Sequence, residues 1–197
     1  MKRQIRCSVF ETNSSSTHSI AIPKCSYVPD HVSFHIGEFG WGWSEVDAAD
    51  YLYTAIYVTS DTKSKAEEKI ARLKNILNKR GITYHLGHVD THIWHDPYDK
   101  SGNKDFFCLD NGYIDHGYEL VDFVEELLND GEKLVRFISE GLVFTGNDNS
   151  DTEQRCFIER TEEYLDDYDW RTGKSSKIKN PYYMSNHEDY EWHYKGN

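Results

Sequence analysis

The sequence has few cysteines and no clustered cysteine pattern. Its four cysteines, Cys7, Cys25, Cys108 and Cys156, are widely spaced, and no two of them form a CxxC pair. This spacing excludes the usual structural zinc motifs and the dense disulfide framework of a small secreted protein. We therefore expect reduced thiols and a cytoplasmic location.

Long apolar runs are also lacking. The first ten residues, MKRQIRCSVF, begin with basic side chains but contain no apolar stretch of about 7–15 residues, which a signal peptide requires. No segment approaches the roughly 20 apolar residues of a membrane-spanning helix. The sequence thus predicts a soluble protein with no membrane partner, and nothing in it specifies an oligomeric state.

Apolar residues in general are scarce, at 38% of the 197 residues, whereas 14% are aromatic. Large rings can supply buried area where aliphatic side chains are few. The chain length fits one compact domain. We predict an α+β protein, with a small mixed or antiparallel sheet and about four to five helices: a single domain over residues 1–170, followed by an extended C-terminal arm over residues 171–197.

Positive charge is lacking in the second half of the chain. Residues 1–110 hold 13 Lys/Arg against 14 Asp/Glu, but residues 111–197 hold 9 against 20, and the formal net charge is −12. An acidic surface repels nucleic-acid phosphates and attracts basic protein surfaces. Solubility alone is the other interpretation. A helix over 151–164, extended to Asp166, would align acids from Glu159 to Asp166 in one stripe.

Hydrophobic periodicity predicts most of the elements. Strands are expected over 2–10, 19–22, 31–36, 82–89, 106–109 and 142–145, with polar loops over 11–18 and 90–105. A first helix is expected to begin with Ser44 as N-cap, and a second with Ser64 or Thr62 as N-cap and Gly81 after its end. Further helices are expected over 118–128, 132–139 and 151–164.

Chemistry-bearing side chains are concentrated in the decapeptide from Phe10 to Ser19, FETNSSSTHS. It combines a carboxylate, an amide, six hydroxyls and an imidazole. Hydroxyls can bind an anion or act as nucleophiles beside a base, and His18 is suited to proton transfer near neutral pH. A polar turn whose hydroxyls cap its own backbone is the alternative. As a loop residue, His18 is expected to tolerate substitution by Ala without unfolding.

The decapeptide resembles the N-terminal signature of a family of proteins encoded by phages and mobile elements of Gram-positive bacteria. Two later fragments, EFGWG from Glu38 and YIDH from Tyr113, are similar to that family, and TGND from Thr145 is a third candidate. Proteins of this kind include inhibitors of bacterial CRISPR defence, and one group is thought to cut the nuclease's guide RNA. The resemblance implies an anti-CRISPR function in the cytoplasm of a bacterial host cell, with a CRISPR effector nuclease or its guide RNA as partner.

If the fragments converge, they predict one pocket. Its expected catalytic residues are His18, His116, Glu11 and Asp115, and its expected substrate-binding residues are Asn13, Ser14, Ser15, Ser16, Glu38, Asn147 and Asp148. Two imidazoles can cleave RNA without a metal, one withdrawing the 2′-OH proton while the other protonates the leaving oxygen. Asp115 would then orient His18. The acids could alternatively hold Mg²⁺.

A rival site is the series His85, His88, His92 and His95, which could bind a metal if it were helical. Gly87, Pro97 and the strand-like pattern of 82–89 argue instead for exposed histidines in a loop. The tail rings from Tyr182 to Tyr194 could stack on RNA bases or pack onto the domain.

Three functions therefore remain open. The first is an anti-CRISPR protein that cleaves or engages guide RNA, as an endoribonuclease in the catalytic case. The second is a stoichiometric acidic inhibitor that covers a nucleic-acid channel, and the third is a phosphoesterase or nucleotide-processing enzyme unrelated to defence.

Overall fold

The computed structural model describes residues 16–40, 44–95, 105–147 and 160–195. Within these ranges the predicted α+β class is confirmed, with about 36% helix and 34% strand. The helices are α1 (Ala48–Val58), α2 (Lys63–Lys79), η1 (Gly117–Leu120), α3 (Val121–Asn129), α4 (Gly131–Glu140) and η2 (His187–Asp189). The strands are β1 (Ser16–Pro23), β2 (His31–Phe34), β3 (Glu38–Phe39), β4 (Ser44–Val46), β5 (Thr83–Leu86), β6 (Thr91–His95), β7 (Asp105–Leu109), β8 (Tyr113–Ile114), β9 (Leu142–Asn147), β10 (Tyr164–Asp169), β11 (Lys174–Lys179) and β12 (Tyr190–Lys195).

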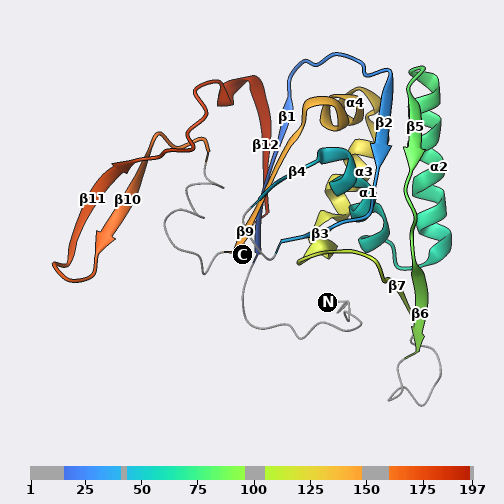
Figure 1. Cartoon of the computed structure of the whole chain (residues 1–197), viewed down its shortest axis with the longest axis horizontal. Coiled ribbons are helices and arrows are strands. Elements are labelled where there is room, and N and C mark those ends of the chain that lie inside the picture. The colour runs from blue at the N-terminus through green and yellow to red at the C-terminus, as the bar shows by residue number, and fades with distance from the viewer. Residues whose placement is uncertain (1–15, 41–43, 96–104, 148–159, 196–197) are drawn as a thin grey trace.

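The largest sheet is antiparallel and has the order β12-β1-β9-β4. Strand β1 lies in its middle, with Ile20 opposite His193 of β12 on one side and Val143 of β9 on the other. Two shorter pairs, β2–β5 and β3–β8, are parallel. The sheet therefore joins a strand near the start of the chain to strands from its last third, and the helices lie to one side of it (Figure 1).

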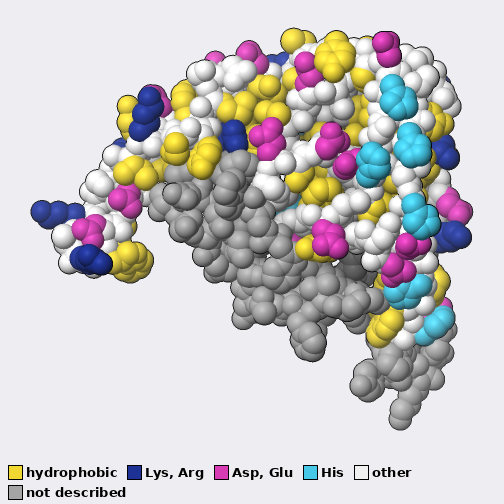
Figure 2. All heavy atoms as spheres, viewed as in Figure 1, with side chains coloured by type: hydrophobic (Ala, Val, Ile, Leu, Met, Phe, Trp, Pro, Cys, Tyr) yellow, Lys and Arg dark blue, Asp and Glu magenta, His cyan; other side chains and the backbone are white. Residues whose placement is uncertain are grey.

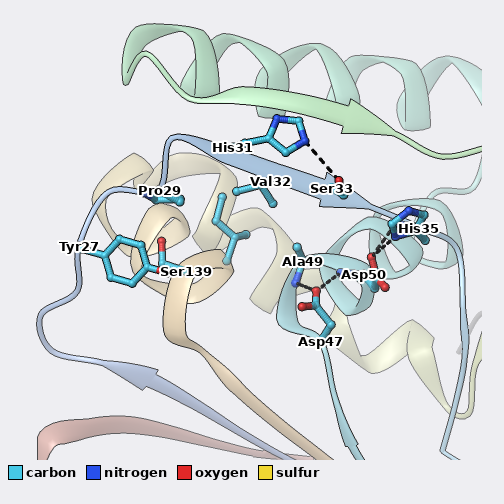
Figure 3. A pocket seen from close by; sticks show the side chains of 11 residues that line it. Tyr27, Pro29, His31, Val32, Ser33, His35, Asp47, Ala49, Asp50 and Ser139 are labelled. Carbon is cyan, nitrogen blue, oxygen red and sulfur yellow. Dashed lines mark hydrogen bonds and ion pairs between the residues drawn. The ribbon is translucent and has the colours of Figure 1, made fainter.

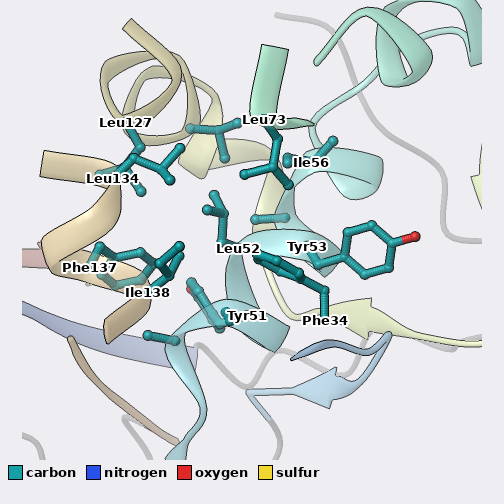
Figure 4. Packing of buried hydrophobic residues seen from close by; sticks show 14 of the residues in the cluster. Phe34, Tyr51, Leu52, Tyr53, Ile56, Leu73, Leu127, Leu134, Phe137 and Ile138 are labelled. Carbon is teal, nitrogen blue, oxygen red and sulfur yellow. The ribbon is translucent and has the colours of Figure 1, made fainter. Parts of the chain in front are cut away.

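The core forms where helix α1 meets its neighbours. Helix α1 contacts β2, β8, α2, α3 and α4, and most of its side chains are buried. Leu52 of α1 lies among apolar side chains from three other helices (Figure 4). Apolar burial of this kind is worth about 25 cal/mol for each Å² removed from water, so the aromatic and aliphatic side chains around α1 provide the main driving force for folding.

Helix boundaries follow capping chemistry. Thr62 caps α2, as one of the two predicted residues, and accepts a hydrogen bond from Lys65 N–H at 3.2 Å. Ser44 is not the cap of α1, which corrects the sequence expectation. Ser44 lies in β4, and Asp47 caps α1 by accepting from the backbone N–H groups of Ala49 and Asp50. Ser and Asp are both favourable N-cap residues. Pairing with β9 keeps residues 44–46 in a strand, so the helix begins only after Asp47.

The C-terminal part of the described chain differs most from expectation. Tyr164 and Asp166 lie in β10, so the predicted helix does not extend to Tyr164 and a helical acidic stripe through Asp166 does not form. Residues 148–159, including Glu159, lie outside the described residues. Strands β10 and β11 form a hairpin that projects from the body (Figure 1), and Trp170 at its end is 88% exposed.

Strand β12 forms an edge of the main sheet by pairing with β1, and Trp192 and Phe144 lie on the face opposite to Ile20. Trp192 of β12 stacks on Phe144 of β9 with ring centroids 6.4 Å apart, and the guanidinium of Arg160 lies 4.0 Å from the centre of the Phe144 ring. The Nε1–H group of Trp192 donates to the carbonyl of His187 at 2.9 Å. Trp192 is therefore a packed side chain here. Among the described residues, no helix has the length and apolarity needed to cross a membrane, and neither Cys25 nor Cys108 forms a disulfide.

Candidate functional site

Strand β1 places His18 in the interior. The strand begins at Ser16, so His18 is a strand residue and its side chain is 0% exposed. Alternation along the strand puts His18 on the same face as Ile20 and Ile22, which pack in the main core. The expectation that His18 belongs to a polar loop is wrong, because pairing with β9 and β12 extends the strand into the decapeptide.

Tyr51 of α1 forms a hydrogen bond with His18. Its hydroxyl and Nδ1 of His18 share a hydrogen bond of 2.8 Å, and the two ring centroids lie 5.7 Å apart. Burial raises the pKa of Tyr51 well above its usual value, so the phenol keeps its proton. The bond holds the imidazole ring in one orientation. When the phenol donates to Nδ1, the neutral form of the imidazole carries its proton on Nε2.

Two hydroxyls extend this polar layer across the sheet. Thr145 of β9 lies directly opposite His18, and Ser44 of β4 lies opposite Thr145. The Ser44 and Thr145 side-chain oxygens are 3.1 Å apart, and Thr145 is fully buried. Thr145 begins the TGND fragment, so the structure brings this fragment beside the end of the decapeptide.

A second pair of fragments meets at β3 and β8. Glu38 lies opposite Tyr113, and Phe39 lies opposite Ile114. The N–H of Asp115 then donates to the carbonyl of Phe39 at 2.8 Å. The Phe39 and Tyr51 ring centroids are 5.5 Å apart, so contacts of Tyr51 reach both this strand pair and His18.

Gly40 allows the chain to pass close to Asp115. Its φ is +114°, which L side chains rarely adopt, and a Cβ at this position would lie 2.6 Å from Cβ of Asp115. Asp115 itself is only 6% exposed. His116, the next residue, is left-handed with a φ of 52° and precedes η1, where its ring lies 6.2 Å from the ring of Tyr118. The turn therefore gives these two neighbouring residues different surroundings: the Asp115 side chain is buried, and the His116 side chain is half-buried.

Only some residues of the predicted pocket lie in the described part of the chain. His18 lies beside Thr145, and Asp115 beside Phe39 and Gly40, whereas Glu38 is exposed on β3. Ser16 and Asn147 are opposite each other at the ends of β1 and β9. The remaining predicted residues, Glu11, Asn13, Ser14, Ser15 and Asp148, lie outside the described residues. A single site that joins His18, Asp115 and His116 stays a prediction.

Sequence reasoning did not identify Tyr51 as a candidate site residue. The missed signal was the phenol oxygen, because a buried tyrosine needs a polar partner for its hydroxyl. It also missed the role of Ser44 beside Thr145. Chemically, the arrangement is a protonated phenol beside a buried imidazole, and it can hold or pass a proton only where a reacting group reaches His18.

The histidine series lies on the surface. His88, His92 and His95 each contact an aspartate, and Nε2 of His88 lies 2.7 Å from Oδ1 of Asp90. His92 contacts Asp110 at 2.5 Å, and His95 contacts Asp105 at 2.7 Å. His92 and His95 belong to β6, a strand that the sequence reading placed in a loop. Figure 2 shows histidines in a row along this side of the molecule.

The structure shows no metal-holding cluster at either site within its described residues. Across the residues that it describes, no group of three or more His, Cys, Asp or Glu side chains is arranged to hold an ion. Of the acids considered for Mg²⁺, Glu38 and Asp115 are described, and they flank the β3–β8 pair. A Mg²⁺ ion bound there stays a prediction, with carboxylates as its expected ligands.

Comparison with known proteins does not extend these assignments. The chain matches no protein-family model, no curated protein and no solved structure at a significant level.

Proposed function

We propose that the protein is an inhibitor of a bacterial CRISPR effector nuclease and that it engages, or cuts, the effector's guide RNA. The observation that carries the proposal is the meeting of the resembling fragments around Tyr51. Ser16 to His18 of the decapeptide pair with Thr145 to Asn147 in β1 and β9, and Glu38 and Phe39 pair with Tyr113 and Ile114 as β3 and β8. Tyr51 contacts both His18 and Phe39.

In the catalytic form of the proposal, His18 and His116 divide the proton transfers. One imidazole withdraws the 2′-OH proton, the oxygen attacks the adjacent phosphorus, and the other imidazole protonates the 5′-oxygen that leaves. Tyr51 holds the ring of His18 in place. Because His18 is 0% exposed, this reaction requires the interior next to β1 to open to the RNA.

In the stoichiometric form, the protein blocks the effector without chemistry. Two observations favour this form: the burial of His18 and the projecting β10–β11 hairpin. The hairpin carries exposed rings at Tyr164, Tyr168 and Trp170, and aromatic side chains are common anchors of protein interfaces. The buried polar layer would then position the strands rather than react.

Incubation with a labelled guide RNA separates the two forms. The protein is added at one-twentieth of the RNA concentration and at equimolar concentration, with and without the effector and with and without EDTA. Cleavage at the low concentration supports catalysis, and loss of that cleavage in EDTA supports Mg²⁺. Inhibition only at equimolar protein, with intact RNA, supports blocking. No effect on effector activity or RNA at any ratio would refute the proposed function.

A matched pair of variants tests the role of His116. His116→Asn removes the acid–base group but suits the left-handed backbone, which Asn adopts readily. We expect this variant to fold and to lose cleavage while still binding the effector. The control is His95→Asn, an exposed histidine at the end of β6, which should retain full activity. Equal activity of both variants would exclude His116 from the chemistry.

A further inference from the structure

A cavity of about 360 Å³ lies beside β2, away from the His18 centre. Its walls come from the segment before β2, from β2 itself, from the start of α1 and from the end of α4 (Figure 3). Val32, Ala49 and Ile138 supply apolar surface, and Tyr27 lies at its side with its ring 61% exposed. The volume is within the usual range for sites that bind small groups or side chains.

The backbone of β2 presents unpaired groups to this cavity. Strand β2 pairs with β5 on one edge. On that edge, the carbonyl of Asp30 accepts from Thr83 N–H at 3.0 Å, and the carbonyl of Phe34 accepts from Gly87 N–H at 2.7 Å. Successive residues of a strand direct their N–H and C=O groups to opposite edges. His31 and Ser33 therefore direct theirs to the other edge, and within the described residues no strand pairs there.

The end of this edge is closed by a carboxylate. The N–H of His35 also points away from β5, and it donates to Oδ1 of Asp50 at 2.6 Å. The same oxygen lies 3.2 Å from Nδ1 of His35. This hydrogen bond shows that the backbone groups of His31, Ser33 and His35 point away from β5. Because Asp50 already occupies the N–H of His35, an added strand can pair only beside His31 and Ser33.

The cavity is negatively charged. Asp47 and Asp50 both line it, and the residues that line it include neither Lys nor Arg. Asp47 directs one oxygen to the N–H groups at the start of α1, and its side chain is otherwise exposed. A guanidinium or ammonium group entering beside the unpaired edge would be attracted by both carboxylates, whereas an anion would be repelled.

We propose that the β2 edge binds an extended segment of a partner protein that carries Lys or Arg. The segment adds to β2 as a third strand, pairs with the backbone groups of His31 and Ser33, and directs a basic side chain toward Asp47 and Asp50. Its apolar neighbours pack on Val32 and Ile138. Backbone pairing supplies affinity and the charged cavity supplies specificity, as in other cases of strand addition. This site is separate from the His18 centre and does not depend on RNA cleavage.

The test uses a fluorescein-labelled, N-acetylated hexapeptide, Thr-Lys-Val-Arg-Val-Thr, and the same peptide with Glu in place of Lys and Arg. Fluorescence polarisation with the full chain should detect the basic peptide and give binding at least about tenfold weaker for the acidic peptide. Absence of binding by the basic peptide, or equal binding by both, would overturn the proposal.

Variants of Ser33 separate strand addition from simple charge attraction. Ser33→Pro removes the outward N–H, and an edge strand tolerates Pro where its N–H faces away from the sheet. We expect about a tenfold loss of peptide affinity. Ser33→Ala keeps the N–H and should bind like the wild type. Unchanged binding by a Ser33→Pro protein with wild-type circular dichroism would refute strand addition.

Variants of the cavity acids test the charge. Asp50→Asn keeps an oxygen that can accept from His35 N–H but removes the charge, so affinity should fall several-fold and depend less on salt. Asp122→Asn, on the exposed face of α3, removes the same charge elsewhere and should have no effect. Equal losses in both variants would show only a general effect of net charge. Displacement of the peptide by an unstructured RNA oligonucleotide would instead assign the site to RNA.

Discussion

The hydroxyl of Tyr51 lies 2.8 Å from Nδ1 of His18, and both side chains are fully buried. One residue belongs to the central helix and the other to the central strand of the main sheet. The bond therefore couples the two layers of the fold at the position where the proposed chemistry would occur.

Removal of this hydroxyl tests the coupling. Tyr51→Phe leaves a buried imidazole nitrogen without that partner, and the free energy of unfolding should fall by about 1–3 kcal/mol in urea denaturation. Inhibition of the effector should also be lost. Tyr53→Phe is the control, because it removes a hydroxyl that donates to Gly87 C=O at 3.2 Å and should preserve inhibition. Equal inhibition by the two variants would remove Tyr51 from the site.

Substitution of His18 itself should now affect stability. A loop residue would contribute little, but the side chain is buried in β1, so His18→Ala leaves a cavity and an unpartnered phenol. We expect a loss of about 2–5 kcal/mol, similar to that for Leu73→Ala. Thermal unfolding of both variants measures this. A melting temperature unchanged only in His18→Ala would show that His18 is not buried as described.

Gly40→Ala should be one of the most damaging substitutions in the chain. It combines a φ of +114° with a Cβ only 2.6 Å from Asp115, and strain and crowding together should cost about 2–5 kcal/mol. Gly81→Ala is the matched control, because Gly81 also has positive φ but no atom lies within 4 Å of its Cβ position. It should cost only about 1–2 kcal/mol. Equal costs would show that Asp115 does not approach Gly40 so closely.

His193 should make stability depend on pH. Burial lowers the pKa of His193, the charge of Lys133 lowers it further, and Glu126 and Glu191 oppose part of that change. Its Nε2 is buried with no hydrogen-bond partner among the described residues. The unfolded chain therefore binds a proton more readily, so stability falls as the pH decreases below about 6.5. The free energy of unfolding is measured from pH 7.5 to 5.0.

Replacement of His193 isolates its contribution. His193→Phe can pack on Phe123, which already lies 5.4 Å from the imidazole, and should reduce the loss of stability on acidification. His193→Gln, which is smaller and does not titrate, should reduce it too. An undiminished loss in both variants would place the acid sensitivity elsewhere.

The acidic surface near the hairpin tests partner capture. Reversal of Glu162, Glu163 and Asp166 to Lys should slow association with the effector by about tenfold at low salt and flatten its salt dependence. Cleavage of free RNA, if the protein performs it, should be unaffected. The matched control reverses three exposed acids elsewhere, Glu67, Glu68 and Asp122. If both triple variants associate normally, the acidic surface serves solubility alone.

Local patterns predicted the elements that depend on their own sequence. In α2, the Thr62 cap and the apolar positions Ile70, Leu73 and Leu77 specify a helix without help from distant residues, and α4 is similar. Ser44 shows the limit of this reasoning. Its cap-like sequence was overridden by pairing with Thr145, a partner that is distant along the chain.

The same limit applies to the C-terminal segment and to the site. Strands β10 to β12 are polar and lack a clear period, and they form because backbone pairing across the hairpin and with β1 stabilises them. Chemical content identified His18 and Asp115 as unusual, but their burial depends on α1 and Gly40. Resemblance grouped the fragments, whereas the partner Tyr51 became evident only in three dimensions.

The position of β1 between β9 and β12 has a consequence for synthesis. Strand β1 leaves the ribosome early, but both of its neighbours come from the last third of the chain. Its apolar residues Ile20 and Ile22 therefore remain without their native strand partners until β9 and β12 have been synthesised. Pairings so distant in sequence form slowly, and exposed strand edges promote aggregation in the meantime. Yield of the native protein in a cell should thus depend on elongation rate and on chaperones that shield the nascent chain.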